Sequence, residues 1–445
     1  MPVKNRTRHK PATLLGSLFA NTVWMLAGKG FGAVCSLVYL AVLTRSLGLK
    51  AFGHFSLILG TSQALIAIAG FQTWRIVVRY GARHAHEKDW AAFGRLGMLA
   101  GVIDVVGALC GCILAYGVIF HFGDTLGLNP ALVNTAFWFN VAALWAIASA
   151  PTGIVRAVDR FDVAVYVEAI VPLGRLLAAV TISLTGPSLA RFLLAWALID
   201  LLEAVLYWGA ARYLCPEAFK RRHLRDWRRA FEENPGLANF AAVTYLGATL
   251  SAAVRSGPLL AIGFFVGTRA AGLYRLSDQL AQGLSKLSAL LTRATYAEIS
   301  RASVAADPAE FRKLTLHTTM LAGGAGMLVV TLAVVAGGAL LEIMGGASFR
   351  NGYVILIPLT VAASFELASV AFEPVLHATG QARIALGTRL LGLAAMIVAA
   401  LLLNAHSGPA IAWSVAIGAA VTYLAFGALT SRTLHRLEKP TERLN

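Results

Sequence analysis

The sequence predicts an all-α protein that crosses a membrane many times and is built from two six-helix lobes. Three observations support this fold class. The chain has 445 residues, of which 58% are hydrophobic and only 13% are charged, with a mean hydropathy of +0.69, whereas about 25% of residues are charged in a soluble domain. Its apolar residues form a series of long runs, and one segment occurs twice.

Twelve apolar runs approach or exceed the roughly 20 residues that a membrane-spanning helix needs. They cover residues 14–43, 52–74, 96–121, 130–152, 162–184, 188–212, 237–264, 270–294, 314–341, 352–376, 384–404 and 408–432. Six runs precede a basic segment and six follow it. An even number of spans in each half leaves both halves the same way up. We therefore expect a parallel repeat with its axis along the membrane normal, not an inverted one.

The repeated segment marks the turn between the first two helices of each half. It runs from Leu43 to Leu57 and returns 219 residues later as Ile262 to Leu276. At this offset, glycines, an alanine, a leucine and a glutamine recur. The matched pairs are Gly48 with Gly267, Ala51 with Ala270, Gly53 with Gly272, Leu57 with Leu276 and Gln63 with Gln282. Glycines suit a tight turn between helices because they accept backbone angles that other residues resist. A duplicated chain explains these matches.

This pattern divides the chain into five parts. They are a basic tail (1–12), an N-lobe (13–212), a connector (213–236), a C-lobe (237–432) and a second tail (433–445). Within the connector, apolar side chains can share one helical face opposite Arg and Lys; these are Phe219, Leu224, Trp227 and Phe231. We expect an amphipathic helix that lies on the inner leaflet and is attracted to anionic lipid.

The basic residues predict the orientation in the membrane. If the N-terminus is cytoplasmic, the inner tails and loops hold 27 Lys and Arg residues and the outer turns hold five. Positive charge accumulates on the cytoplasmic side of membrane proteins. The sequence therefore predicts a multi-pass protein of the bacterial inner membrane with both termini in the cytoplasm. Its outer loops are short, so no large extracytoplasmic domain is expected.

Several function classes can be set aside. The net charge of +16 does not indicate nucleic-acid binding, because the basic residues flank apolar spans and form no stripe with stacking aromatics. Cys110 and Cys112 would point to different sides of a helix, so we expect no metal site and no cofactor. No ATP-binding loop or hydrolase motif is found in a suitable context. These observations favour a transporter over an enzyme.

Charged residues inside the predicted spans are the candidate functional residues, because charge in a bilayer core is costly and usually faces a wet cavity. Basic candidates for an anionic substrate are Lys29, Arg175, Arg255, Arg275 and Lys286. Acidic candidates for ion coupling are Asp200, Glu203 and Glu366. Further intramembrane acids are Asp104, Glu168, Asp278 and Glu373.

The spacing of these charges also suggests pairs. Arg175 is a candidate partner for Asp200 and Glu203, and Arg275 is three residues from Asp278, close enough to pair on one helix face. Arg389 lies near a helix end, so we expect it to reach the inner interface instead. We expect Lys29 and Arg255, whose helices begin the two halves, to border a central cleft. Their charge would suit a phosphate.

The first repeat carries a family resemblance. Asn21 is followed by the pattern L-x-R-x-L-G-x-x-x-F-G-x-F-x-L, formed by Leu43, Arg45, Leu47, Gly48, Phe52, Gly53, Phe55 and Leu57. This pattern resembles the opening of the polysaccharide flippases, the O-antigen and exopolysaccharide translocases of the multidrug/oligosaccharidyl-lipid/polysaccharide exporter superfamily. The twelve predicted spans depart from the fourteen of the lipid II flippases in that superfamily, which counts against a role in peptidoglycan synthesis.

The resemblance implies two lobes in a V shape, alternating access, and an undecaprenyl-diphosphate-linked oligosaccharide as cargo. It also implies basic residues along the cleft, with Lys29 as the best match by position. Polysaccharide polymerase or chain-length proteins are candidate partners. The pathway would be the synthesis of O-antigen or exopolysaccharide.

Three alternatives stay open. A cation-coupled multidrug antiporter of the same superfamily would have an acidic cleft, and Asp200, Glu203 and Glu366 fit it. A major-facilitator transporter also has six plus six helices, but residues 70–83 lack the acidic member of its usual loop motif. A scaffold or glycan polymerase is the non-transport alternative, and the polymerase would need a large outer loop.

Overall fold

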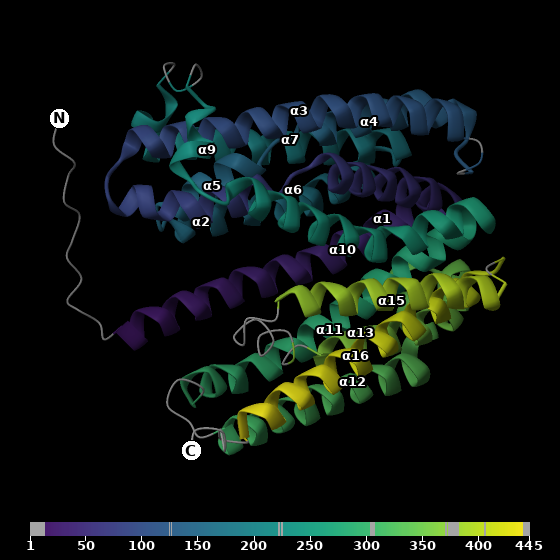
Figure 1. Ribbon diagram of the computed structural model, residues 1–445. Coiled ribbons are helices and arrows are strands. Elements are labelled where there is room, and N and C mark those ends of the chain that lie inside the picture. Colours follow the sequence, from purple (N-terminus) through teal and green to yellow (C-terminus); the bar gives the residue numbers. More distant parts are fainter. Residues whose placement is uncertain are drawn as a thin grey trace.

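The computed structural model describes residues 14–302, 308–369 and 382–438, apart from short gaps at 124, 126, 221–222, 224–225 and 405, together with residue 372. Side chains are described mainly within 30–286, 319–369 and 387–432. All regular structure in this part of the chain is helical. Figure 1 shows one bundle formed by the first half (purple to teal) and another formed by the second half (green to yellow).

The first bundle holds the helices before the connector. They are α1 (Leu14–Ala69), α2 (Thr73–His86), α3 (Trp90–Phe122), α4 (Val133–Trp145), α5 (Ser149–Ala157), α6 (Phe161–Thr185) and α7 (Leu189–Leu214). The second bundle holds α10 (Leu237–Phe265), α11 (Thr268–Ala302), α12 (Pro308–Gly345), α13 (Tyr353–Ala368), α15 (Ala382–Leu402) and α16 (Gly408–Glu438). Short 3-10 helices precede α4 and α13: η1 (Pro130–Leu132) and η3 (Ala347–Gly352).

Eight helical segments in the described residues are long and apolar enough to cross a membrane. Helices satisfy their own backbone hydrogen bonds, which the bilayer core requires. One of the eight, Gly30–Ala69, bends at Gly48, where the sequence places the boundary between two spans. The all-helical membrane fold is therefore confirmed, whereas the number of twelve passes stays a prediction.

The repeated turn forms a reciprocal contact between the two halves. Gly48 (φ 70°) and Gly267 (φ 105°) both adopt the left-handed backbone conformation that favours glycine. A methyl group on Gly53 would overlap the carbonyl oxygen of Thr268, and one on Gly272 would lie 3.0 Å from that of Leu49. Leu49 and Thr268 are themselves 219 residues apart. Each copy of the turn thus packs its glycine against the same carbonyl of the other copy.

Arg45 and Thr44, beside this turn, tie α1 to the end of α12. The Arg45 guanidinium donates to the carbonyl oxygen of Ile343 (Nη2–O 2.6 Å, Nε–O 3.1 Å). The Thr44 hydroxyl donates to the carbonyl oxygen of Met344 at 2.9 Å. Because α12 ends at Gly345, these carbonyls belong to its last turn, where positive charge is favourable. The contact explains why the turn motif holds an arginine.

Two helices of the first bundle are broken where the sequence predicts continuous spans at 52–74 and 130–152. The gaps separate α1 from α2 and α4 from α5. Asp104, on α3, bonds the first turns of the two helices that follow these gaps, α2 and α5. Its Oδ1 accepts a hydrogen bond from the Thr73 hydroxyl at 2.7 Å, and its Oδ2 accepts one from the Ala150 N–H at 2.9 Å. This buried carboxylate therefore has a structural role.

Replacing Asp104 with alanine is expected to lower the melting temperature of the purified protein in detergent. The change leaves the buried Ala150 N–H without its acceptor, at a cost of about 1–3 kcal/mol, while the Thr73 hydroxyl can still donate to the Ser149 hydroxyl at 2.9 Å. Asp104→Asn keeps one acceptor oxygen and should fall between the wild type and Asp104→Ala. Equal melting temperatures for the wild type and Asp104→Ala would show that the breaks do not depend on this residue.

The connector is not the amphipathic helix that the sequence predicts. It contains the short helices η2 (Pro216–Phe219) and α9 (Arg229–Glu233), and it folds against the first bundle. Trp227 packs beside a buried cluster that includes Ile76, Leu96 and Leu99. Glu233 forms an ion pair with Arg95 (Oε1–Nη2 2.5 Å). Phe219 and Trp227 are therefore used in protein packing, whereas Phe231 is exposed and Leu224 lies outside the described residues.

Candidate functional site

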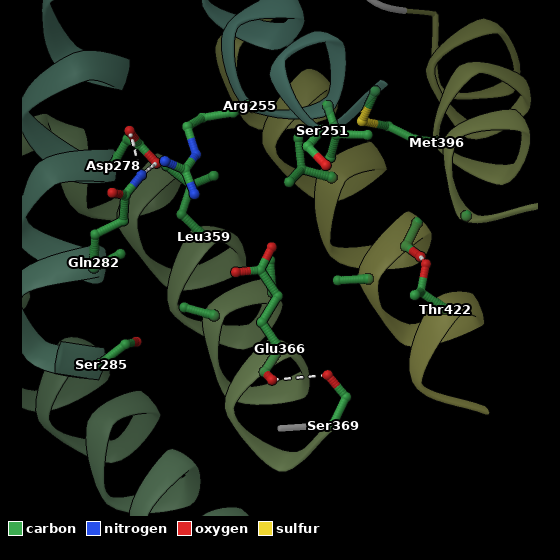
Figure 2. A pocket seen from close by; sticks show the side chains of 18 of the residues that line it. Ser251, Arg255, Asp278, Gln282, Ser285, Leu359, Glu366, Ser369, Met396 and Thr422 are labelled. Atoms are coloured by element: carbon green, nitrogen blue, oxygen red, sulfur yellow. Dashed lines mark hydrogen bonds between the residues drawn. The ribbon is translucent and has the colours of Figure 1, made fainter. Parts of the chain in front are cut away.

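The larger described cavity lies inside the second bundle, and its volume is 520 Å³. Its walls come from α10, α11, α13, α15 and α16. Five charged side chains line it: Arg255, Asp278, Lys286, Glu366 and Arg389. Three of the five are basic. Figure 2 shows this cavity and its polar side chains. The sequence suggested a cleft between the lobes, but every residue that lines this cavity belongs to the C-lobe.

Arg255 reaches the cavity from α10. Figure 2 shows its side chain pointing toward Asp278 and Gln282. The Gln282 side-chain amide, one turn along α11, donates to both carboxylate oxygens of Asp278 at 3.0 Å. Among the described residues, Arg255 makes no ion pair of 4.0 Å or less. Its guanidinium lines the cavity beside the Asp278 and Glu366 carboxylates and acts on them electrostatically without a close ion pair, so an anion in the cavity could accept its donors.

Glu366 and Lys286 also border the cavity. The Glu366 carboxylate reaches into the space from α13 (Figure 2), and both side chains are exposed. Glu366 and Asp278 are the two acidic groups of the cavity wall. The cavity thus combines donors for an anionic ligand with two carboxylates that a cation or proton could use.

Arg389 lines the cavity as well, so the expectation that it extends to the membrane interface is wrong. Its Nη1 donates to the Ser251 hydroxyl oxygen on α10 at 3.0 Å. Position along the helix did not indicate this contact with Ser251, which lies near the middle of α10.

Arg175 lies elsewhere, inside the first bundle. It forms an ion pair with Asp200 (Nη2–Oδ1 2.7 Å), as the sequence suggested, and its guanidinium lies over the Trp196 ring at 5.5 Å. Glu203 lies one turn further along α7. The Arg175–Asp200 pair joins α6 to α7 and lines neither cavity, so packing explains it.

The remaining candidates are divided. Arg275 does not line the cavity. In the described part of the chain it forms no ion pair with Asp278 within 4.0 Å, and the Asp278 carboxylate accepts hydrogen bonds from Gln282 instead. Lys29 lies outside the residues whose side chains are described, and so does Glu373. The sequence missed Gln282 and Ser251 as site residues. The match of Gln63 with Gln282 in the repeat was the available signal for Gln282. Nothing in the sequence indicated Ser251.

A smaller cavity of 350 Å³ lies in the first bundle. Arg156 and Glu168 form an ion pair at its wall (Nη2–Oε1 2.6 Å), and Tyr207 donates to the same carboxylate oxygen at 3.2 Å. These groups satisfy one another. The larger cavity, with unpaired donors, is therefore the better candidate for binding an anion. Within the described residues, no cluster of His, Cys, Asp and Glu could hold a metal ion.

Comparison with known proteins supplies a family. Residues 18–303 match the family described as polysaccharide biosynthesis protein. The chain is 25% identical over 354 residues to the inner membrane protein YghQ of Escherichia coli K12, covering 76% of this chain and 95% of that protein.

Two solved structures share the fold. An inward-facing multidrug-resistance MATE family transporter of the MOP superfamily matches with a TM-score of 0.67 at 12% identity, over 92% of this chain and 96% of that one. The lipid II flippase MurJ in an inward closed conformation matches with a TM-score of 0.69 at 11% identity, over 94% of this chain and 90% of that one.

Proposed function

Because the chain belongs to the polysaccharide biosynthesis protein family, we propose that it is a flippase for an oligosaccharide linked to undecaprenyl diphosphate. The family, the inner-membrane relative and the shared transporter fold support transport across a membrane. The protein would lie in the bacterial inner membrane, with both termini in the cytoplasm. No covalent step is required.

The C-lobe cavity is the observation that carries this proposal. Its volume of 520 Å³ lies within the usual range for ligand sites, about 300–1,000 Å³. Arg255, Lys286 and Arg389 supply positive charge, and Arg255 has donors that face the cavity. Arginine binds phosphate through planar paired donors and lysine binds it as a point charge. The diphosphate and the first sugar would occupy this cavity while the polyprenyl tail stays in lipid.

Movement of the two lobes would then carry the cargo across the membrane. The reciprocal contact at Gly53 and Gly272 joins the lobes at the end predicted to face outward. While it is closed, the cargo would enter from the inner leaflet. Separating this contact would open the site to the other side, and the sugar chain would follow the diphosphate.

Reconstitution into liposomes tests the proposal. Liposomes that contain the purified protein and a fluorescent polyprenyl-diphosphate oligosaccharide should expose it to an external lectin faster than protein-free liposomes. In cells, deletion of the gene should cause lipid-linked oligosaccharide to accumulate and surface polysaccharide to disappear. Unchanged exposure in liposomes that contain the correctly oriented protein would contradict the proposal.

A cation-coupled multidrug antiporter is the second candidate, because Asp278 and Glu366 line the same cavity. In that case Glu366 would bind the coupling ion. The antiporter should expel an organic cation such as ethidium when an ion gradient is imposed, and Glu366→Gln should stop this efflux. Efflux of ethidium without translocation of the lipid-linked oligosaccharide would favour the antiporter.

A further inference from the structure

An exposed row of arginines lies on α2, outside the cavity. Arg75, Arg79 and Arg83 are spaced four residues apart, so they share one face of the helix. Ile76 and Val77 are buried on the other side. In the part of the chain described here, none of the three arginines forms an ion pair of 4.0 Å or less. Like charges at this spacing destabilise a helix, so the row has a cost that an anionic ligand would remove.

The arginine row lies beside the beginning of α10. The Arg79 guanidinium lies over the Phe240 ring, 4.3 Å from its centroid. Arg83 donates to the carbonyl oxygen of Glu233, just before α10, at 3.1 Å. Figure 1 shows α2 and the start of α10 at the same end of the molecule as α9. This end is predicted to be cytoplasmic.

One face of α10 leads from the arginine row to the cavity. Phe240, Gly247, Ser251 and Arg255 lie seven, four and four residues apart, a spacing that keeps them on one side of a helix. The distance along the axis is about 22 Å at 1.5 Å per residue. A methyl group on Gly247, between the two ends, would meet no atom within 4 Å, so space is open at this position. Ser251 and Arg255 already line the cavity.

We propose that the α2 arginines bind the diphosphate of the polyprenyl-linked substrate as it enters from the inner leaflet, and that it then follows this face of α10 into the cavity. The inference rests on the proposed function, because it names an entry site for the same substrate. Two guanidinium groups one helical turn apart can contact both phosphates of a diphosphate, whereas an ordinary phospholipid offers one phosphodiester.

Binding of farnesyl diphosphate to the full-length protein in nanodiscs of zwitterionic lipid tests the entry site. All chains in this assay carry Arg255→Gln, which removes the diphosphate contact proposed for the cavity, and the test variant adds Arg75→Gln with Arg79→Gln. The control is Arg228→Gln with Arg229→Gln, which removes two exposed charges from the same side of the membrane and, like the test variant, takes an arginine off a tryptophan ring. The test variant should bind at least about tenfold more weakly than the control, since two charged donors of hydrogen bonds to the diphosphate are lost.

Competition identifies the source of the phosphate. Inorganic pyrophosphate should compete with farnesyl diphosphate, and phosphatidylglycerol should compete weakly and to the same extent in both variants. Equal weakening of both variants, or no weakening of the test variant, would overturn the entry site. Preferential binding of phosphatidylglycerol to the α2 arginines would also overturn it.

Gly247→Trp tests the path separately, because the added ring would fill the open space on α10. This variant should retain farnesyl diphosphate binding at α2 and lose most translocation of the oligosaccharide in liposomes. Normal translocation by Gly247→Trp would overturn the path. If the proposed function itself were wrong, liposomes that contain the wild-type protein would fail to translocate the oligosaccharide, whatever the α2 variants bind.

Discussion

Replacing Gly53 with alanine is expected to abolish most transport while the protein still inserts into the membrane. The added methyl group would overlap the carbonyl oxygen of Thr268 and lie 2.7 Å from its carbonyl carbon. Real Cβ atoms essentially never approach backbone this closely, and backbone cannot rotate away as a side chain can. The contact between the two turns must therefore open, which should shift the protein away from the conformation that is closed at this end.

Spin labels on the two copies of the turn would measure this shift. Lys50 and Arg269 are equivalent by the repeat and both are exposed, so cysteines at these positions can be labelled in a chain whose native cysteines have been replaced. The label-to-label distance should be longer in Gly53→Ala than in the wild type. Gly117→Ala is the control, because a methyl group there meets no atom within 4 Å. Unchanged distance and transport in Gly53→Ala would show that the turns are not the closed gate.

Replacing Arg255 with glutamine is expected to reduce oligosaccharide translocation by about 10- to 100-fold. A hydrogen bond to a charged group contributes about 1.5–3 kcal/mol, and each 1.4 kcal/mol is a factor of ten in affinity. Arg255→Lys keeps the charge but loses the planar pair of donors, so it should be intermediate. The measurement is the rate of lectin exposure in liposomes at several substrate concentrations.

Arg350→Gln is the matched control for Arg255. Arg350 is exposed in η3 and pairs with Glu342 (Nη1–Oε2 3.3 Å), away from the cavity. Its loss changes the net charge equally but should leave transport near the wild-type rate. Equal rates for Arg255→Gln and the wild type, at equal protein abundance, would remove Arg255 from the substrate site and with it the main support for a diphosphate in this cavity.

The architecture could be predicted because the bilayer leaves few alternatives. Long apolar runs must become helices, and the matched glycines at 48 and 267 both have the positive φ that favours glycine. The breaks near Gly70 and Ala146 could not be predicted, because they depend on a third helix. Asp104 accepts hydrogen bonds from the Thr73 hydroxyl and the Ala150 N–H, in the first turns of the helices that follow the breaks, and no local pattern connects residue 104 to residues 73 and 150.

The connector shows the same limit. Its apolar residues have the periodicity of an amphipathic helix, but periodicity does not reveal whether protein or lipid covers them. Here the neighbouring helices α2 and α3 cover Trp227, whereas Phe231 stays exposed. The ion pair between Glu233 and Arg95 holds the connector against α3, and Arg95 lies more than a hundred residues before Glu233 in the chain.

The sequence could predict which charged residues belong to the candidate site better than it could predict how they are arranged. Depth in the predicted spans selected Arg255, Lys286 and Glu366, which the structure places around one cavity. Depth could not distinguish them from Arg175, which is equally deep but bonded to Asp200. It also excluded Arg389, which lines the cavity. The facing direction of a side chain depends on the neighbours of its helix, which a single sequence does not reveal.

The mutual packing of Gly53 and Gly272 bears on how such a chain arose. An interface in which each partner presents the same atoms to the other is the kind formed by a two-fold symmetric pair of identical subunits. A six-helix ancestor that associated with a second copy of itself would already have had this contact before its gene was duplicated and fused. The fusion then freed the two copies to diverge, so that one could retain a basic pocket while the other neutralised the charge in its cavity with the Arg156–Glu168 pair.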